Sequence, residues 1–278
     1  MKSRMLLSSA GLILALLVAA ALSLYLSQDR LIYFPQRSLD AAPTDYGLTA
    51  DDLSIQTRDG VRLAGWWIHG RTRTVLIFFH GNAGNASHRL ERVRDLVTAL
   101  GPDVVLVDYR GYGASGGRPS ETGLYEDAEA VGAAVAARGV APERIVLFGE
   151  SLGCAVVLES ALHRPCAAVI LEAPFLSAAA MAKRIYPFLP GLLVRASMDN
   201  ASKISRLAVP KLIVQAERDE VVPPDQTRRL FALAAAPKEY FVIPGAHHND
   251  TYLVGGRPYL EVLRRFLDDV ASAGTNRP

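Results

Sequence analysis

The chain has 278 residues, half of them hydrophobic, and its 30 basic and 28 acidic side chains leave a formal net charge of only +2. This length fits one α/β domain with an appendage. The balanced charge gives no field that would attract nucleic acid, so we expect no nucleic-acid partner. The two cysteines, Cys154 and Cys166, are too few for a disulfide framework and are expected to be core thiols.

The N-terminus carries an uncharged, largely apolar run from Met5 to Leu26. A run of this length can cross a bilayer as a helix. A cleaved signal peptide is the alternative, because residues 19–21 are three alanines, but apolar residues continue beyond them. We therefore predict a single-pass membrane anchor over residues 1–27.

Basic residues on either side of the anchor bear on its orientation. Lys2 and Arg4 precede the apolar run and favour a cytoplasmic N-terminus, whereas Arg30 and Arg37 behind the run weaken this bias. The catalytic domain is accordingly expected on the non-cytoplasmic side of the membrane. Residues 28–52 show no clear period and are predicted to be a juxtamembrane connector.

From residue 53 to residue 272, short β-branched or aromatic runs alternate with longer helical patterns. This alternation is typical of an α/β domain with a mostly parallel, doubly wound sheet and helices on both faces. Residues 273–278 are then a tail. The predicted strands span 62–68, 75–79, 104–107, 145–148, 168–171, 211–215 and 239–243, and the predicted helices span 87–100, 121–137, 152–163, 225–235 and 258–270.

Residues 173–205 form an insertion that is rich in large apolar side chains, among them Phe175, Ile185 and Phe188. The insertion lies between two predicted strands, where a short cap could cover a site at the edge of the sheet. An apolar cap beside a membrane anchor suggests a hydrophobic acyl group as ligand, but a helix packed on the core explains the composition equally well.

The pattern Gly-x-Ser-x-Gly occurs twice, around Ser115 and around Ser151. A nucleophilic serine in this pattern needs a sharp turn from a strand to a helix, which presents the hydroxyl above the sheet. Ser151 follows the predicted strand 145–148 and opens the predicted helix 152–163. Ser115 lies among glycines and a proline, which indicate a loop. We therefore predict Ser151 as the nucleophile.

The loop around Ser115 also matches a dinucleotide-binding fingerprint, Gly-x-Gly-x-x-Gly, over residues 111–116. No helix can open through the Gly-Gly-Arg-Pro sequence at 116–119, and the preceding strand is not the first of a βαβ unit. We expect a glycine-rich turn here and no cofactor.

A serine hydrolase needs a base close to the hydroxyl, and six histidines are candidates. The adjacent pair His247 and His248 follows the last predicted strand, where the chain order Ser, acid, His places the base. Spacing alone does not separate the two. His80 is expected under the oxyanion loop in a structural role. Adjacent loop histidines without further ligands are a poor zinc site, so no metal is expected.

The acid must follow Ser151 and lie at the carboxyl end of a strand, which leaves Glu172 and Asp219. Asp219 fits better, because it lies in a polar turn between a predicted strand and a helix. The oxyanion donors should be two backbone amides, that of Leu152 after the nucleophile and that of Asn82 in the loop after strand 75–79.

Together these motifs resemble the α/β-hydrolase superfamily, in particular its membrane-anchored branch of protein depalmitoylases and serine aminopeptidase-like members. The resemblance implies the α/β-hydrolase fold, Ser151 as nucleophile and Asp219 as acid. It also implies His248 as base, since the catalytic imidazole of that branch directly precedes Asn-Asp. No cysteine-rich N-terminus is present, so the depalmitoylase substrate is not carried over. The matching segments are 31–35, 80–83, 108–113, 149–153, 219–222 and 248–250.

We therefore expect hydrolysis of a carboxylic ester or thioester through an acyl-serine intermediate. The expected partners are a small-molecule or lipid-like acyl substrate and the membrane. Two alternatives stay open: a serine peptidase, because the triad does not separate amides from esters, and a non-catalytic binding scaffold that retains the fold. The sequence gives no indication of the oligomeric state.

Overall fold

An eight-stranded sheet forms the centre of the chain in the computed structural model, which describes residues 11–12, 15–16, 18–19, 21–188 and 190–275. The strand order is β1-β2-β4-β3-β5-β6-β7-β8. β1 and β2 are antiparallel to their neighbours, and the strands from β4 to β8 are parallel, which confirms the predicted mostly parallel sheet. The strands are β1 Ala50–Gln56, β2 Arg62–Ile68, β3 Val75–Phe79, β4 Asp103–Val107, β5 Ile145–Glu150, β6 Ala168–Glu172, β7 Lys211–Ala216 and β8 Lys238–Ile243.

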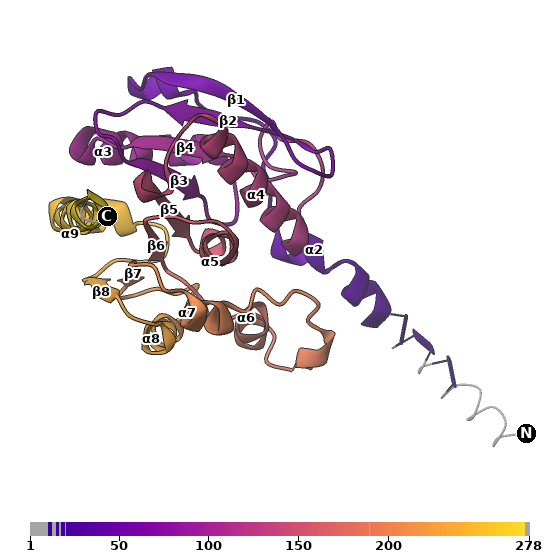
Figure 1. Cartoon of the computed structure of the whole chain (residues 1–278). Coiled ribbons are helices and arrows are strands. Elements are labelled where there is room, and N and C mark those ends of the chain that lie inside the picture. The colour runs from indigo at the N-terminus through magenta and orange to yellow at the C-terminus, as the bar shows by residue number, and fades with distance from the viewer. Residues whose placement is uncertain (1–10, 13–14, 17, 20, 189, 276–278) are drawn as a thin grey trace, which may run out of the picture.

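Helices cover both faces of this sheet, as expected for a doubly wound domain (Figure 1). One core contains residues of α4, α5, α7 and α8, and the other contains residues of α3 and α9. The α-helices are α2 Gln28–Ile32, α3 Leu90–Leu100, α4 Glu121–Ala137, α5 Leu152–His163, α6 Ala178–Ile185, α7 Asn200–Arg206, α8 Pro224–Leu233 and α9 Thr251–Thr275. The 3-10 helices are η1 Pro43–Tyr46, η2 Ala86–Arg89, η3 Pro142–Arg144 and η4 Gly191–Leu193.

Strand β3 shows how the sequence produces the two cores. Val75, Ile77 and Phe79 belong to one core, and the intervening Leu76 and Phe78 belong to the other. Successive side chains of a strand point to opposite faces, so a continuous apolar run suits a sheet covered on both sides. Burying one such side chain contributes roughly 1.5–3 kcal/mol to folding.

Parallel strands bring four loops to one edge of the sheet. The carboxyl ends of β3, β5, β7 and β8 lead into the loops that carry Asn82, Ser151, Asp219 and His248. In open α/β sheets this edge is where ligands bind. The topology therefore gathers residues that are up to 166 positions apart in the sequence, which is the separation of Asn82 and His248.

The segment expected to be a connector, residues 28–52, packs on the domain. It contains α2 and η1, and its last residues begin β1. Tyr33 is buried in the core formed with α4 and α5. Strand β1 was not predicted, because Leu53 and Ile55 are its only buried residues and the rest of the strand is largely polar. The predicted tail, residues 273–278, begins inside a helix, because α9 continues to Thr275.

Much of the predicted anchor, namely residues 1–10, 13–14, 17 and 20, lies outside the described residues. Within the part of the chain that is described, no helix is both long and apolar enough to span a bilayer. Residues 21–26 are helical and point away from the domain (Figure 1). Their side chains Leu22 and Leu26 are exposed.

Candidate active site

Ser151 lies in the sharp turn between β5 and α5. Its backbone has φ +51° and ψ −109°, a combination that L-residues rarely adopt. The Ser151 amide donates to the Glu172 carbonyl at 2.8 Å, and its carbonyl accepts from the Cys154 amide at 3.0 Å. These bonds hold the strained turn and leave the hydroxyl facing the carboxyl edge of the sheet.

The glycines on both sides of Ser151 are required by close backbone contacts. A Cβ at Gly149 would lie 2.6 Å from the Gly153 carbonyl oxygen, and a Cβ at Gly153 would lie 2.0 Å from the Phe79 carbonyl oxygen. No real Cβ tolerates such distances. Helix α5 therefore approaches the end of β3 closely, which places the nucleophile beside the loop that begins at His80.

His248 connects Ser151 to Asp219. Its Nε2 lies 3.1 Å from Ser151 Oγ, and its Nδ1 lies 2.8 Å from Asp219 Oδ2. Asp219 also accepts from the backbone amides of Val221 and Val222, at 3.0 and 2.7 Å, which fix the carboxylate. Because the carboxylate accepts from Nδ1–H, Nε2 is left free to accept the serine proton.

The surroundings of His248 favour its charged form. Burial by itself lowers the pKa of this histidine, but the hydrogen bond and charge of Asp219, with the charges of Glu150 and Glu172, raise the pKa above its ordinary value of 6.5. The imidazole is 9% exposed and the Asp219 side chain 2%. An imidazolium that forms during proton transfer is therefore stabilised.

A buried ionic network that was not predicted from the sequence lies behind Ser151. Arg92 of α3 forms ion pairs with Glu172 and, at 3.5 Å, with Glu150, the residue before Ser151. Tyr259 and Thr251 of α9 donate to Glu172. Arg92 and Glu172 are both buried, so each needs the other to offset its desolvation.

This network also occupies Glu172, the second acid candidate from the sequence, away from His248. Its carboxylate is bound to Arg92, Tyr259 and Thr251, whereas the carboxylate on His248 is that of Asp219. Glu150 forms a second ion pair with Arg89 at 3.1 Å. Burial raises the pKa of Glu150, but the charges of Arg89 and Arg92 outweigh it and hold the pKa below the ordinary value. A charged residue between the glycine and the serine was the one sequence signal for this cluster.

The two predicted oxyanion residues lie beside the nucleophile. Asn82 and Leu152 line the same cavity as Ser151. Leu152 is the first residue of α5, where amides have no partner within the helix. The adjacent His80 is fully buried, with Nδ1 2.8 Å from the Gly81 carbonyl oxygen and its ring centroid 4.4 Å from that of Tyr109.

A largely apolar cavity of about 940 Å³ opens at Ser151. One wall comes from the N-terminal segment, including Leu24, Leu31 and Phe34, and another comes from the cap, including Met181 and Phe188. Within the predicted cap 173–205 the structure has α6, η4 and α7. None of the described residues that line this cavity is charged. The cavity therefore suits an apolar chain attached to the reacting carbonyl.

Two competing candidates from the sequence lie elsewhere. Ser115 is fully buried; its hydroxyl donates to the Asp108 carbonyl at 2.7 Å and accepts from the Ala64 amide at 2.9 Å. The surrounding glycines 111, 113 and 117 have positive φ, which fits a loop and not a helix start. His247 is half exposed and lies 3.1 Å from Glu220 Oε2, so it faces solvent beside the site.

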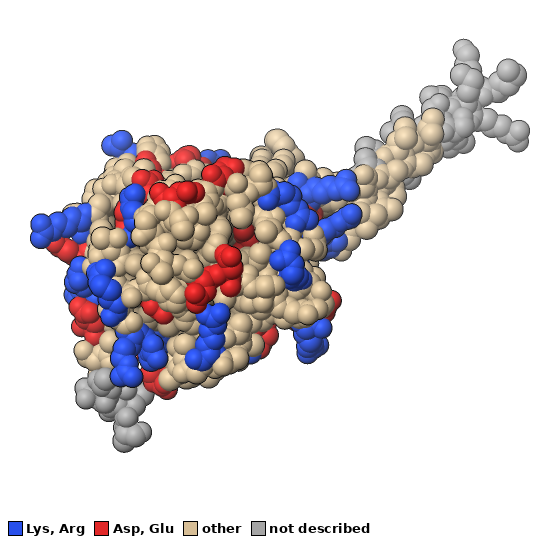
Figure 2. All heavy atoms as spheres, turned by 90° about the horizontal axis from the view of Figure 1, so that it is seen from above, with Lys and Arg blue, Asp and Glu red and all other residues tan. Residues whose placement is uncertain are grey.

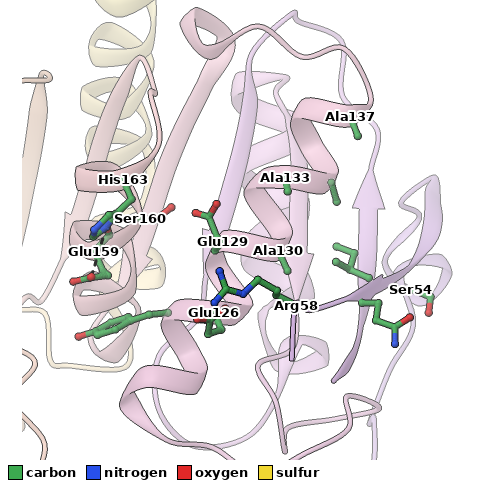
Figure 3. A pocket seen from close by; sticks show the side chains of 14 residues that line it. Ser54, Arg58, Glu126, Glu129, Ala130, Ala133, Ala137, Glu159, Ser160 and His163 are labelled. Carbon is green, nitrogen blue, oxygen red and sulfur yellow. Dashed lines mark hydrogen bonds and ion pairs between the residues drawn. The ribbon is translucent and has the colours of Figure 1, made fainter. Parts of the chain in front are cut away.

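A second hollow of about 880 Å³ lies between β1, α4 and α5 (Figure 3). Its lining shares no residue with the cavity at Ser151. His163 contacts the backbone and side chain of Glu159 in its own helix, and Glu159 also pairs with Lys203. These are surface ion pairs and not a base beside a nucleophile. Among the described residues no cluster of His, Cys, Asp or Glu could hold a metal ion.

Known proteins resemble this chain over most of its length. A family model described as serine aminopeptidase, S33, matches residues 70–196. An uncharacterized protein of Mycobacterium tuberculosis is 40% identical over 270 residues, covering 94% of this chain and 95% of its own. The alpha/beta hydrolase domain-containing protein WAV2 of Arabidopsis thaliana is 36% identical over 285 residues, covering 92% of each chain. The chain belongs to the α/β-hydrolase superfamily.

A solved structure agrees with the fold of this α/β hydrolase. The esterase Pf2001 of Pyrococcus furiosus superposes with a TM-score of 0.70 at 21% identity, over 86% of this chain and 98% of the esterase. The superfamily expected from the six sequence segments is confirmed. The family model ends at residue 196, ahead of Asp219 and His248, so the assignment of these two residues rests on the geometry described above.

Proposed function

We propose that this α/β hydrolase cleaves carboxylic esters or thioesters with hydrophobic acyl groups, using Ser151, His248 and Asp219. The observation that carries the proposal is the imidazole of His248, which lies within hydrogen-bond distance of both Ser151 and Asp219 at the mouth of an apolar cavity. A nucleophile, a base and an orienting carboxylate in this order are the parts that acyl transfer to serine needs.

In the proposed reaction, Ser151 Oγ attacks the acyl carbonyl carbon while His248 Nε2 accepts the hydroxyl proton. The backbone amides of Asn82 and Leu152 donate to the oxyanion at about 3 Å. The imidazolium then gives its proton to the departing alcohol or thiol, which leaves an acyl-serine. A water molecule, deprotonated by the same imidazole, attacks the acyl-serine and releases the carboxylic acid. No cofactor takes part in these steps.

The character of the cavity supports an acyl group in preference to a peptide. The name of the matching family model, serine aminopeptidase, makes an aminopeptidase the second candidate. An aminopeptidase binds a free α-ammonium group, which calls for a carboxylate near the nucleophile. The described lining of the cavity contains neither Asp nor Glu. A hydrocarbon chain, in contrast, gains about 0.8 kcal/mol for each methylene that it buries there.

The membrane location is likewise a proposal. We propose that the apolar run 5–26 anchors the chain in a single pass and that the catalytic domain lies on the non-cytoplasmic side. The cap supports a position close to lipid, because Ile185, Tyr186 and Phe188 are exposed, the last to 98%. Figure 2 shows basic side chains where the projecting segment joins the domain; Arg30 of α2 and Arg195, which pairs with Asp29 of α2, belong to this region.

The reaction can be tested with the full chain in detergent. Matched series of p-nitrophenyl esters, thioesters and amino-acid anilides would be compared by kcat/KM. We expect the esters and thioesters to be cleaved faster than the anilides, with kcat/KM rising with acyl length. Faster turnover of the anilides would instead establish the peptidase. A fluorophosphonate probe should label Ser151, as located by mass spectrometry; an unlabelled Ser151 in folded protein would support the non-catalytic scaffold.

A further inference from the structure

A short segment that begins at Ile32, the last residue of α2, and ends before η1 runs along the loop after β3 that carries Asn82; we call this segment, residues 32–38, the strap. Pro35 forms a β-bridge with Gly84, and the Gln36 amide donates to the Gly84 carbonyl at 3.0 Å. The side-chain amide of Asn85 donates to the Ser38 carbonyl at 2.6 Å. The strap is therefore bound to the loop that carries one of the proposed oxyanion donors.

The closest connection between strap and loop is made by the side chain of Asn82. Its Nδ2 donates to the Ile32 carbonyl, and its Oδ1 accepts from the Phe34 amide at 3.1 Å. The Tyr112 hydroxyl donates to the same Oδ1 at 2.8 Å. Burial raises the pKa of Tyr112 well above its ordinary value, so this hydroxyl stays protonated and keeps donating. Three hydrogen bonds thus fix the side chain of the residue whose backbone amide is one of the two proposed oxyanion donors.

The loop needs such restraint because its backbone is strained. Ala83, directly after Asn82, has φ +72°, in the left-handed region that non-glycine residues avoid. Gly84 also has a positive φ of +78°, and a Cβ there would lie 2.2 Å from His88 Nδ1. A strained conformation persists only where surrounding contacts determine it. Here the contacts come from the strap on one side and Tyr112 on the other.

We propose that the Asn82 side chain is a positioning group for the oxyanion hole, which aligns its own backbone N–H by tying the loop to the strap. This inference rests on the proposed function, because it assumes that the Asn82 amide stabilises an oxyanion. It gives the backbone of Ile32 and Phe34, to which the Asn82 side chain is bound, a role in holding the loop. A misplaced donor lowers kcat and leaves ground-state binding in the apolar cavity nearly unchanged.

The test compares Asn82→Ala with Gln36→Ala in the full chain. Both changes remove a side-chain amide and keep the backbone amide. The Gln36 side chain, however, donates its hydrogen bonds among the described residues to Ser38 and Asp40, and not to the loop that carries Asn82. We expect Asn82→Ala to lower kcat per titrated active site roughly 10- to 100-fold, with KM within about twofold, because a displacement of about 1 Å costs this much. Gln36→Ala should retain the wild-type kcat.

Tyr112→Phe provides a milder second variant, since it removes one hydroxyl and leaves the bonds to Ile32 and Phe34. We expect it to lower kcat by a smaller factor in the same direction, with KM unchanged. If Asn82→Ala and Tyr112→Phe lower only the number of titratable sites or the melting temperature, and keep the wild-type kcat per site, the positioning role is wrong. A wild-type chain without ester or thioester turnover would overturn the proposed function itself, and this inference with it.

Discussion

At the level of single residues, the hydroxyl of Ser151 is the proposed nucleophile and contributes little to the stability of the fold. The hydroxyl forms a hydrogen bond with His248 Nε2, and the strained turn is held by backbone hydrogen bonds that alanine also makes. We expect Ser151→Ala to lower kcat by about 10⁴-fold or more. The melting temperature should shift by only a few degrees. Ester turnover and thermal unfolding of the same preparation check both statements.

The buried Ser115 should behave in the opposite way. Ser115→Ala removes the hydroxyl that bonds the Asp108 carbonyl and the Ala64 amide, both in the interior. A buried polar group left without its partner costs about 1–3 kcal/mol. We therefore expect a lower free energy of unfolding, measured in urea, with kcat close to that of the wild type. A loss of turnover in folded Ser115→Ala protein would reopen the choice of nucleophile.

The pH dependence of turnover should report the environment of His248. Turnover needs the neutral imidazole, so activity is lost as pH falls through the pKa of His248. Burial lowers the pKa of His248, but the carboxylates around it raise the pKa by more, so the net pKa lies above 6.5. The acid limb of kcat/KM should therefore lie above pH 6.5.

Asp219→Asn tests this assignment directly. The change removes the negative charge that raises the pKa, so the acid limb should move to lower pH while the plateau falls by roughly 10⁴-fold. The raised pKa of His248 affects stability in the opposite direction from activity. It adds to the free energy of unfolding below the pKa that His248 has in the unfolded chain, and this contribution is lost as pH rises through the pKa of the folded state. An acid limb that stays in place in Asp219→Asn would exclude Asp219 as the partner.

At the level of secondary-structure elements, the contact between α5 and β3 sets the position of the nucleophile. A Cβ at Gly153 would lie 2.0 Å from the Phe79 carbonyl oxygen and 3.0 Å from the His80 carbonyl oxygen, and both are backbone atoms that cannot rotate away. Gly153→Ala should therefore lower the free energy of unfolding by about 1–3 kcal/mol or more and reduce kcat as well. Gly191→Ala is the matched control, because a Cβ there meets nothing within 4 Å. Equal stability of the two variants would contradict the close approach.

The elements that could be predicted were those with many buried apolar residues. The ranges expected for β2, β3, α4 and α5 match the structure residue for residue, because long apolar runs bounded by turn residues leave a clear pattern. Strand β1 is an edge strand that pairs with β2 alone, and Leu53 and Ile55 are its only buried residues. Two apolar positions in a largely polar segment are too weak a pattern to predict a strand. The order of strands and loops predicted Ser151 and Asp219 and left His247 and His248 open; the choice of His248 came from the resemblance to the α/β-hydrolase superfamily.

Contacts between distant segments could not be predicted from the sequence. The ion pair of Arg92 with Glu172 joins α3 to β6, and nothing in either local pattern specifies the partner. The strap shows the same limit: residues 32–38 have no period, and their structure comes from bonds to Asn82 and Gly84. Both features depend on tertiary packing. Hydrophobic periodicity in one sequence predicts helices and strands, but not which distant residues they contact.

At the level of the whole molecule, the cavity joins three parts of the chain. The N-terminal segment and the cap form its walls, and the carboxyl edge of the sheet provides the nucleophile. In Figure 1 the N-terminal segment projects from the side of the domain next to α2. An acyl chain attached at Ser151 would therefore extend toward the proposed membrane anchor. In the proposed membrane-anchored state, the position of the domain relative to the bilayer would decide which acyl chains reach the site.

The size of this cavity should limit the acyl chains that the enzyme prefers. Each buried methylene adds about 0.8 kcal/mol, so kcat/KM should rise about fourfold per methylene until the cavity is full. Met181 lines the cavity from α6, and Met181→Trp should fill part of it. The variant should lose activity on long acyl chains, keep it on acetate and propionate esters, and reach its plateau at a shorter length. Leu233→Trp, on the exposed side of α8, adds the same ring outside the cavity and should leave the length profile unchanged. Identical profiles for Met181→Trp and the wild type would mean that the acyl chain binds elsewhere.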